Sequence, residues 1–187
     1  MGQPPDSLLD RLRRGGSRQD WERFVDLYGP LLEFWARRLL PADDAADLTQ
    51  DVLLRVMQGL RSFTGAGDRS FLAWLRAVTL NRWRDLRRRA AARPRTAGSA
   101  ALEAVAGADD LAAVITAEDR ALLIRRALQI MRTNFEPTTW RACWERVVAD
   151  RPAAEVAAEL GVSVEVVYAA TYRVIRRLRS ELAGAWG

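Results

Sequence analysis

The 187-residue chain contains no histidine and no lysine, and its single cysteine is Cys143. Histidine is the commonest general base and metal ligand, so its absence counts against most enzyme and metal-site chemistry. One thiol forms no internal disulfide and no multi-cysteine zinc or iron–sulfur site, and it is compatible with a reducing compartment. The sequence shows no cysteine pair and no glycine-rich phosphate loop. We therefore expect a protein that is not an enzyme and that needs no cofactor or metal.

Long apolar runs are also missing, because no stretch approaches the roughly 20 residues that span a bilayer. The N-terminal sequence MGQPPDSLLD lacks the basic and apolar segments of a signal peptide. Asp6 stands where a myristoylation motif has Ser or Thr. These features predict a soluble, cytoplasmic protein with no membrane partner.

All 29 basic residues are arginines, against 24 acidic residues, and the net charge is +5. The charge is unevenly distributed, since residues 76–95 hold eight arginines and one acid, whereas residues 96–119 hold five acids and no arginine. Basic segments favour anionic partners such as nucleic acids. The acidic stretch is rich in Ala and Gly and has no aromatic residue, so it predicts a linker. We predict two domains, at 1–92 and 117–187, joined by a flexible acidic linker at 93–116.

Apolar residues recur at helical spacing along almost the whole chain, and β-branched alternation is rare. The sequence therefore predicts an all-α fold with two small helical domains. The first domain should contain four helices. The first is capped by Ser7 and ends at Gly15-Gly16, and the second is capped by Ser17 and has a kink at Gly29-Pro30. The third runs from Asp43 to about Leu60, and the fourth runs from about Ser70 to the arginines before Pro94. The second should contain helices at about 117–134, 137–149, 153–160 and 164–183.

The third expected helix has two distinct faces. Its apolar row should face the core and consists of Leu48, Val52, Val56 and Leu60. The opposite row mixes acids with one exposed leucine and consists of Asp47, Asp51, Leu54 and Gln58. From this pattern alone the row is either an acidic docking surface or a solvated face with an incidental leucine.

The fourth expected helix combines arginines with a tryptophan. An inward stripe is formed by Phe71, Trp74, Leu75, Val78 and Leu86, while another face carries Arg76, Thr79, Trp83 and Arg87. Arginines neutralise phosphates, and an exposed aromatic ring gives unpaired bases a stacking platform. This face therefore suggests binding of single-stranded nucleic acid. The alternative is that Trp83 is buried against a neighbouring helix, beside a solvated basic end.

The segment RPAAEVAAELGVSVEVVYAATYRVIRRLR is typical of a helix-turn-helix, with a turn at Gly161 and Ser163 as N-cap. Apolar residues occupy the positions that such units bury, namely Val156, Leu160, Val162, Val167 and Ala170. Small Ala157 stands where the two helices cross. The outward residues could enter a major groove, although the same shape also occurs as a plain packing corner. Phosphate contacts are favoured over base readout, because Ala169 and Ala170 offer the groove almost nothing polar.

Three segments follow one another along the chain: DAADLTQDVLLRV, then RSFLAWLRAVTLNRWRDLRRR, then the helix-turn-helix. Together they resemble a bacterial RNA polymerase sigma factor of the extracytoplasmic-function type. The resemblance covers about residues 6–90 as the region-two domain and 117–183 as the region-four domain. It implies a protein that binds core RNA polymerase and directs promoter recognition and melting in transcription initiation. The alternative is a stand-alone helix-turn-helix regulator not associated with polymerase, which leaves the first domain unexplained.

The resemblance assigns three sets of residues and the partners that go with them. Docking on core RNA polymerase is assigned to Asp47, Gln50, Asp51, Leu54 and Gln58. Binding of the melted minus-ten strand is assigned to Arg76, Thr79, Arg82, Trp83, Arg84, Arg87 and Arg88. Binding of the minus-thirty-five duplex is assigned to Ser163, Glu165, Tyr168, Ala169, Tyr172, Arg173, Arg176 and Arg177. An anti-sigma factor is a further candidate partner.

Two features depart from the pattern of such families. Many relatives carry a polar or basic trio where this chain has Tyr168, Ala169 and Ala170, which puts its readout of the minus-thirty-five element in doubt. The segment before the helix-turn-helix is rich in tryptophan, with Trp140 and Trp144 on one face beside Cys143. We interpret these residues as core packing, and Cys143 as a small buried hydrophobe rather than a redox sensor.

Overall fold

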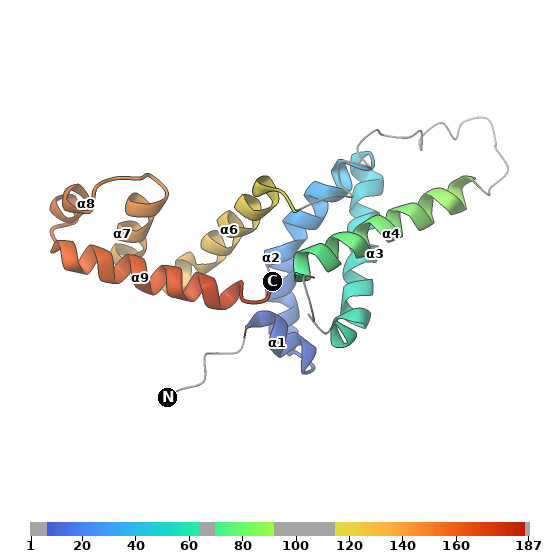
Figure 1. The fold of residues 1–187 in the computed structure, drawn as a ribbon, viewed down its shortest axis with the longest axis horizontal. Helices are drawn as coiled ribbons and strands as arrows, with labels where there is room; N and C mark the ends of the chain where they lie inside the picture. The colour runs from blue at the N-terminus through green and yellow to red at the C-terminus, as the bar shows by residue number, and fades with distance from the viewer. Residues whose placement is uncertain (1–6, 64–69, 92–114, 186–187) are drawn as a thin grey trace.

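The computed structural model describes residues 7–63, 70–91 and 115–185, and within these ranges it contains helices and no strand (Figure 1). The predicted all-α fold is therefore confirmed. The helices before the acidic segment are α1 (Leu8–Arg13), α2 (Arg18–Arg37), α3 (Ala42–Gly59), the 3₁₀ turn η1 (Leu60–Ser62) and α4 (Phe71–Ala91). Those after it are α6 (Ala117–Met131), the 3₁₀ turn η2 (Arg132–Asn134), α7 (Pro137–Val147), α8 (Ala153–Leu160) and α9 (Val164–Glu181).

Side-chain caps define most of the helix starts that the sequence predicts. Ser7 caps α1, and Ser17 forms a reciprocal capping box with Asp20 at the start of α2. Helix α3 begins one residue before Asp43, after Pro41, and has no side-chain cap. Helix α2 continues through Pro30 from Arg18 to Arg37. The predicted elements are thus present, and their ends differ from the predicted ends by a few residues.

An aromatic cluster fills the centre of the first four helices. The Phe24 ring lies 4.7 Å from the Tyr28 ring and 6.0 Å from the Phe71 ring, measured between centroids. The predicted inward row of α3 is fully buried around it: Leu48, Val52, Val56 and Leu60. Of the inward stripe predicted for α4, Phe71 and Leu75 are fully buried, and Trp74, Val78 and Leu86 are half-buried.

This core also takes in residues from beyond the acidic segment. Leu123 and Ala127 of α6, together with Leu182 and Ala185 after α9, belong to the same buried cluster as the α2 and α4 side chains. The Leu72 amide donates a hydrogen bond to the Ala185 carbonyl at 3.2 Å. The helices on both sides of the predicted linker are therefore packed together in this structure. Except for Ile115 and Thr116, the linker itself lies outside the described residues.

The helix-turn-helix has a separate small core. Its buried members are Ala142, Ala153, Val156, Ala157, Val167 and Ala170, with Leu160, Val162 and Val164 packed against them. Gly161 ends α8 in the left-handed conformation with φ of 65°, and Ser163 caps α9. The turn therefore uses glycine where an L side chain would be strained.

Replacing Gly161 with alanine should lower the free energy of unfolding by about 1 kcal/mol, because the left-handed conformation is strained for an L side chain. A Cβ at this position would meet no atom within 4 Å, so backbone strain is the only cost. Gly59→Ala is the matched control, because Gly59 has φ of −96° and its Cβ would make an ordinary 3.5 Å contact with Trp74. Urea unfolding followed by circular dichroism measures both, and equal stability of Gly161→Ala and the wild type would contradict the assignment.

Candidate polymerase and nucleic-acid interfaces

The outer face of α3 is exposed, as the sequence predicts. Asp47, Gln50 and Gln58 lie on the surface, and the Leu54 side chain is 57% exposed. Met57 is also exposed, at 48%, and sequence reasoning missed it. The sequence could have indicated Met57, because it follows Leu54 by three residues and side chains at that spacing lie on one side of a helix. The face therefore presents two large apolar side chains among polar and acidic ones.

Ion pairs join this face of α3 to the basic helix α4. The half-buried Asp51 carboxylate accepts a hydrogen bond from Arg82 Nε at 2.8 Å and a second one from the same guanidinium. Arg55 of α3 lies 3.8 Å from the Asp85 carboxylate of α4, which also pairs with Arg88. The resemblance assigns Asp51 to polymerase docking and Arg82 to DNA binding, and the structure places these two side chains in contact with each other.

Trp83 does not form an exposed platform, and that prediction is wrong. Its side chain is 4% exposed and belongs to the main core. The Arg87 guanidinium carbon lies 5.0 Å from the centre of the Trp83 ring, as in a cation–π contact. Trp83, Arg84, Arg87 and Arg88 still line one shallow hollow at the end of α4, together with Ala91. The structure therefore brings these four predicted residues together.

Arg76 and Thr79 are buried, contrary to the predicted contact with DNA. Arg76 is 6% exposed, and its Nη1 atom donates a hydrogen bond to Asp119 Oδ2 at 2.8 Å. The Arg76 guanidinium also lies over the Trp35 ring, 5.4 Å from its centre. The Thr79 hydroxyl donates to the Leu75 carbonyl at 2.9 Å within α4. Arg76 is buried because the first turn of α6 packs over it.

Asp119 is the main residue that sequence reasoning missed. It is 2% exposed, and its Oδ1 accepts a hydrogen bond from Trp35 Nε1 at 2.8 Å. Burial alone would raise the pKa of Asp119, but the hydrogen bonds from Trp35 and Thr116 and the charge of Arg76 outweigh it and hold the pKa below its ordinary value. The capping box of Thr116 and Asp119 was visible in the sequence, whereas the contact with Trp35, 84 residues away, was not.

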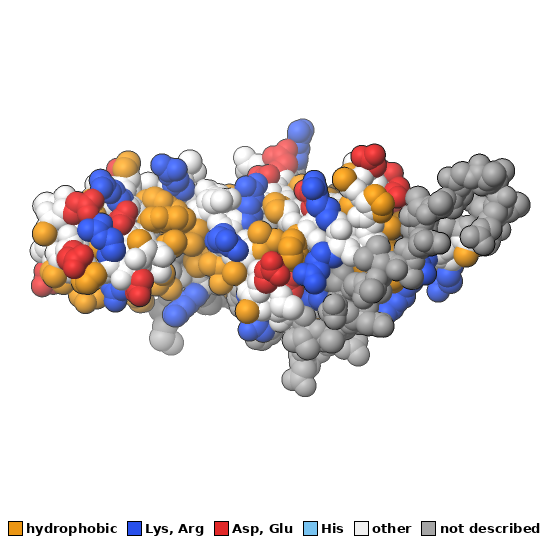
Figure 2. Space-filling model, turned by 90° about the horizontal axis from the view of Figure 1, so that it is seen from above, with side chains coloured by type: hydrophobic (Ala, Val, Ile, Leu, Met, Phe, Trp, Pro, Cys, Tyr) orange, Lys and Arg blue, Asp and Glu red, His pale blue; other side chains and the backbone are white. Residues whose placement is uncertain are grey.

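Helix α9 presents the predicted outward face. Its exposed residues include Glu165, Tyr168, Ala169, Tyr172, Arg173 and Arg176, and Ser163 is exposed at its start. Hydrogen bonding from Ser163 lowers the pKa of the Glu165 carboxyl. Arg177 differs, because its Nη2 donates to the buried Glu181 carboxylate at 2.7 Å. At this end of the molecule basic and acidic side chains alternate (Figure 2), as in the pairs of Arg151 with Glu145 and Glu159.

The tryptophan-rich segment is partly core and partly surface. Phe135, Trp140 and Trp144 form a row of neighbouring rings, with centroids 6.5 Å and 6.0 Å apart. Trp140 is half-buried, but Trp144 is 38% exposed, so the prediction of core packing holds for Trp140 and is wrong for Trp144. Cys143 is buried as predicted, and burial raises the pKa of its thiol to about 11.

Neither a metal site nor a membrane span is found in the described part of the chain. No group of three or more His, Cys, Asp or Glu side chains there could hold a metal ion. None of the helices described is both long and apolar enough to cross a bilayer.

Cys143 should react slowly with a thiol reagent such as dithionitrobenzoate in the folded protein. The thiolate is the reactive form, and raising the pKa from 9.0 to about 11 lowers its fraction about a hundredfold near neutral pH. Reaction in urea supplies the rate for the exposed thiol. We expect the folded protein to react at least about a hundredfold more slowly at about pH 8. Equal rates would show an accessible, activated thiol and would revive the redox-sensor interpretation.

Comparison with known proteins supports the resemblance. Residues 24–93 match the family model described as Sigma-70 region 2, and this segment includes α3 and α4. No curated protein matches the chain. A solved structure titled "Structure of CnrH in complex with the cytosolic domain of CnrY" shares 23% sequence identity with this chain over 94% of each chain, with a TM-score of 0.37. The resemblance to a sigma factor is therefore supported by the family match and not by this structure. Residues 24–93, which hold α3 and α4, are therefore similar to region 2 of the sigma-70 family.

Proposed function

We propose that this chain is a sigma factor of the extracytoplasmic-function type, which binds core RNA polymerase through α3 and promoter DNA through α4 and α9. It would thereby direct promoter recognition and melting. The observation that carries the proposal is the region 2 match over residues 24–93, which covers α3 and α4. Sigma factors are not enzymes, and this one would act by supplying binding energy that favours the melted promoter. Its place of action would be the cytoplasm, and an anti-sigma partner stays a prediction of the resemblance.

The exposed apolar pair on α3 supports the polymerase contact. Leu54 and Met57 are exposed side by side, and large apolar side chains with a polar rim are typical of protein interfaces. Asp47, Gln50 and Gln58 supply that rim. The surface therefore fits a protein partner with an apolar contact and basic residues around it.

The hollow at the end of α4 supports contact with a melted strand. Arg84 and Arg88 are exposed beside it and could neutralise phosphates. Arg87 lies over the Trp83 ring and lines the same hollow, so its guanidinium adds a third positive charge there.

The exposed face of α9 supports contact with duplex DNA. Arg173 and Arg176 are placed to bind phosphates, while Tyr172 and Tyr168 offer hydroxyls and ring surface. Glu165 is a charged acceptor on this face and could accept a hydrogen bond from a cytosine amino group in the major groove. Binding by this helix should therefore depend mainly on charge and shape.

Leu54→Arg should weaken binding to core RNA polymerase by at least about thirtyfold, the effect of losing a central apolar contact worth 2 kcal/mol or more. Val25→Arg is the matched control, because Val25 is a 43% exposed apolar residue on α2 and not on the proposed face of α3. Affinity is measured by co-migration of the purified proteins over a concentration series. Unchanged affinity of Leu54→Arg would overturn the docking assignment, whereas equal loss in both variants would point to a general effect of the added charge.

Arg84→Ala combined with Arg88→Ala should flatten the salt dependence of binding to single-stranded promoter DNA. Each lost phosphate contact lowers the slope of log K against log salt by about 0.7. The control pair, Arg18→Ala and Arg37→Ala, removes two exposed arginines of α2 and should leave the slope unchanged. Fluorescence polarisation with the polymerase-bound protein measures the slope, and an unchanged slope for the α4 pair would refute the contact. Trp83→Ala is a poorer test, because truncating a buried tryptophan also destabilises the core.

A further inference from the structure

The exposed face of α9 changes in character along the helix. The exposed residues of its first turns are one acid and four residues with apolar surface, namely Glu165, Val166, Tyr168, Ala169 and Tyr172. The exposed residues that follow are arginines, beginning with Arg173 and Arg176. In helix-turn-helix proteins the N-terminal residues of the helix in the groove contact the base edges. The apolar part of α9 is therefore the part that would meet the bases.

The first turns of α9 offer few polar groups to a base. Thr171 is half-buried, and its hydroxyl oxygen is buried with no hydrogen-bond partner among the described residues. Between Glu165 and Arg173 the exposed polar side-chain groups are therefore two tyrosine hydroxyls, each at the far end of a ring. A contact of Ala169 with a base is consequently apolar.

Four exposed side chains form one row along α9. Ala169 and Tyr172 are three residues apart, Glu165 precedes Ala169 by four residues, and Arg176 follows Tyr172 by four. Side chains at these spacings lie on the same side of a helix. The row therefore passes from a carboxylate through an apolar centre to a guanidinium.

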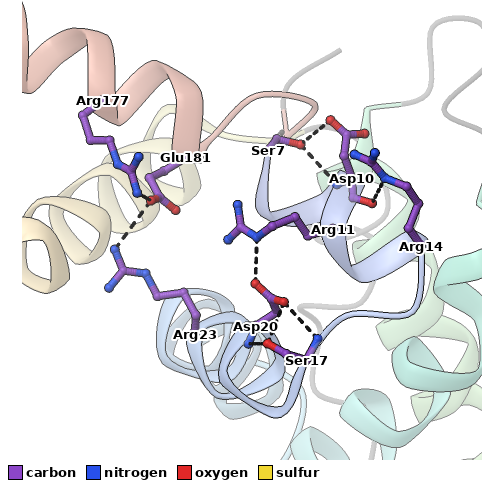
Figure 3. A network of polar contacts seen from close by, with 9 residues as sticks. All are labelled: Ser7, Asp10, Arg11, Arg14, Ser17, Asp20, Arg23, Arg177 and Glu181. Carbon is purple, nitrogen blue, oxygen red and sulfur yellow. Dashed lines mark hydrogen bonds and ion pairs between the residues drawn. The ribbon is translucent and has the colours of Figure 1, made fainter. Parts of the chain in front are cut away.

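The arginines of α9 do not supply a base preference. Arg177 pairs with the end of its own helix, because its Nη2 atom donates to the buried Glu181 carboxylate at 2.7 Å (Figure 3). Arg173 and Arg176 are exposed and placed for phosphates. Phosphate contacts orient a protein on the duplex but carry no sequence information. A base preference must therefore come from the carboxylate and the apolar centre of the row.

An apolar side chain in the major groove favours one base over the others. Thymine presents a 5-methyl group there, whereas cytosine and adenine present amino groups and guanine presents two acceptors. Contact with the methyl group buries apolar surface, but contact with an amino or carbonyl group displaces water without replacing its hydrogen bonds. The apolar centre of the row would thus attract thymine and also discriminate against the other bases.

We propose that Ala169 and Tyr172 select thymine in the duplex element that α9 binds, through contact of the Ala169 methyl group and the Tyr172 ring with thymine 5-methyl groups. The inference rests on the function proposed above and names the base preference of its duplex site. The absence of a polar trio at Tyr168, Ala169 and Ala170 then changes the kind of readout and does not remove it. Charge supplies most of the affinity, and the methyl contacts supply the sequence preference.

The test replaces thymine with deoxyuridine, which lacks the 5-methyl group and keeps every hydrogen-bonding group. Duplexes that the full chain prefers, in complex with core RNA polymerase, are first selected from a randomised pool. Each thymine of the selected element is then replaced in turn, and affinity is measured by fluorescence polarisation. At one or more positions the replacement should weaken binding about fourfold, the effect of one methyl group leaving an apolar contact.

The Ala169→Gly variant assigns one contact to its residue. Removal of the methyl group from the protein should abolish the difference between thymine and deoxyuridine at one position, as in a double-mutant cycle. The loss of helix stability that glycine causes affects both duplexes equally and cancels in the ratio of their affinities. Ala158→Gly is the matched control, because Ala158 is an exposed alanine of α8, and this variant should keep the ratio.

Two variants of Tyr172 separate its ring from its hydroxyl. Tyr172→Ala should abolish the difference between thymine and deoxyuridine at a second position. Tyr172→Phe keeps the ring and should keep that difference, because the proposed contact does not use the hydroxyl.

The outcomes distinguish the readout from the function. Equal affinity for thymine and deoxyuridine at every position, in a protein that still selects duplex DNA, would overturn the methyl readout and leave the proposed function standing. A difference that survives in both Ala169→Gly and Tyr172→Ala would overturn the assignment to these residues. Failure to select any duplex, even with polymerase, would overturn the proposed function and the readout with it.

Discussion

The carboxylate of Asp119 connects parts of the molecule that the sequence separates by an acidic segment. It receives the indole N–H of Trp35 and the guanidinium of Arg76, and it caps its own helix through the Thr116 amide at 2.8 Å. Every polar atom of this carboxylate therefore has a partner, which is the condition for keeping a charge inside a protein. Around this carboxylate α6 docks on α2 and α4, Arg76 is buried, and Leu123 joins the main core. The helices on both sides of the acidic segment are consequently packed together in this structure.

The arginines of this chain include some that pair with acids and others that lie exposed on the faces proposed to bind DNA. An all-arginine set of basic residues provides planar donors that pair well with carboxylates inside the fold and with phosphates outside it. Arg82, Arg151 and Arg177 are used in pairs with acids. Arg84 and Arg173 lie at the surface, on the two faces proposed to meet DNA. The net charge does not distinguish the paired arginines from the exposed ones, and it would suggest that all of them can bind nucleic acid.

Much of the fold could be predicted because its signals are local. Caps such as Ser17 and Ser163, the glycine at position 161 and the buried row that begins at Leu48 follow from spacing and side-chain chemistry within a few residues. The candidate sites were predicted less well, because burial depends on distant partners. Arg76 was assigned to DNA, and the residue that buries it is 43 positions away. Likewise, Trp83 stands among arginines in the sequence, and only the packing of α4 on its neighbours places the ring in the core.

This chain is proposed to give RNA polymerase its promoter specificity, and transcription by the reconstituted enzyme tests that role most directly. Core RNA polymerase from the source organism is incubated with the purified protein and with genomic DNA fragments, and the RNA start sites are mapped. We predict start sites that core polymerase alone does not use, each preceded by a shared pair of sequence elements at constant spacing. The same start sites with and without the protein, under conditions in which its helix-turn-helix still binds DNA, would contradict the claim and favour a stand-alone regulator.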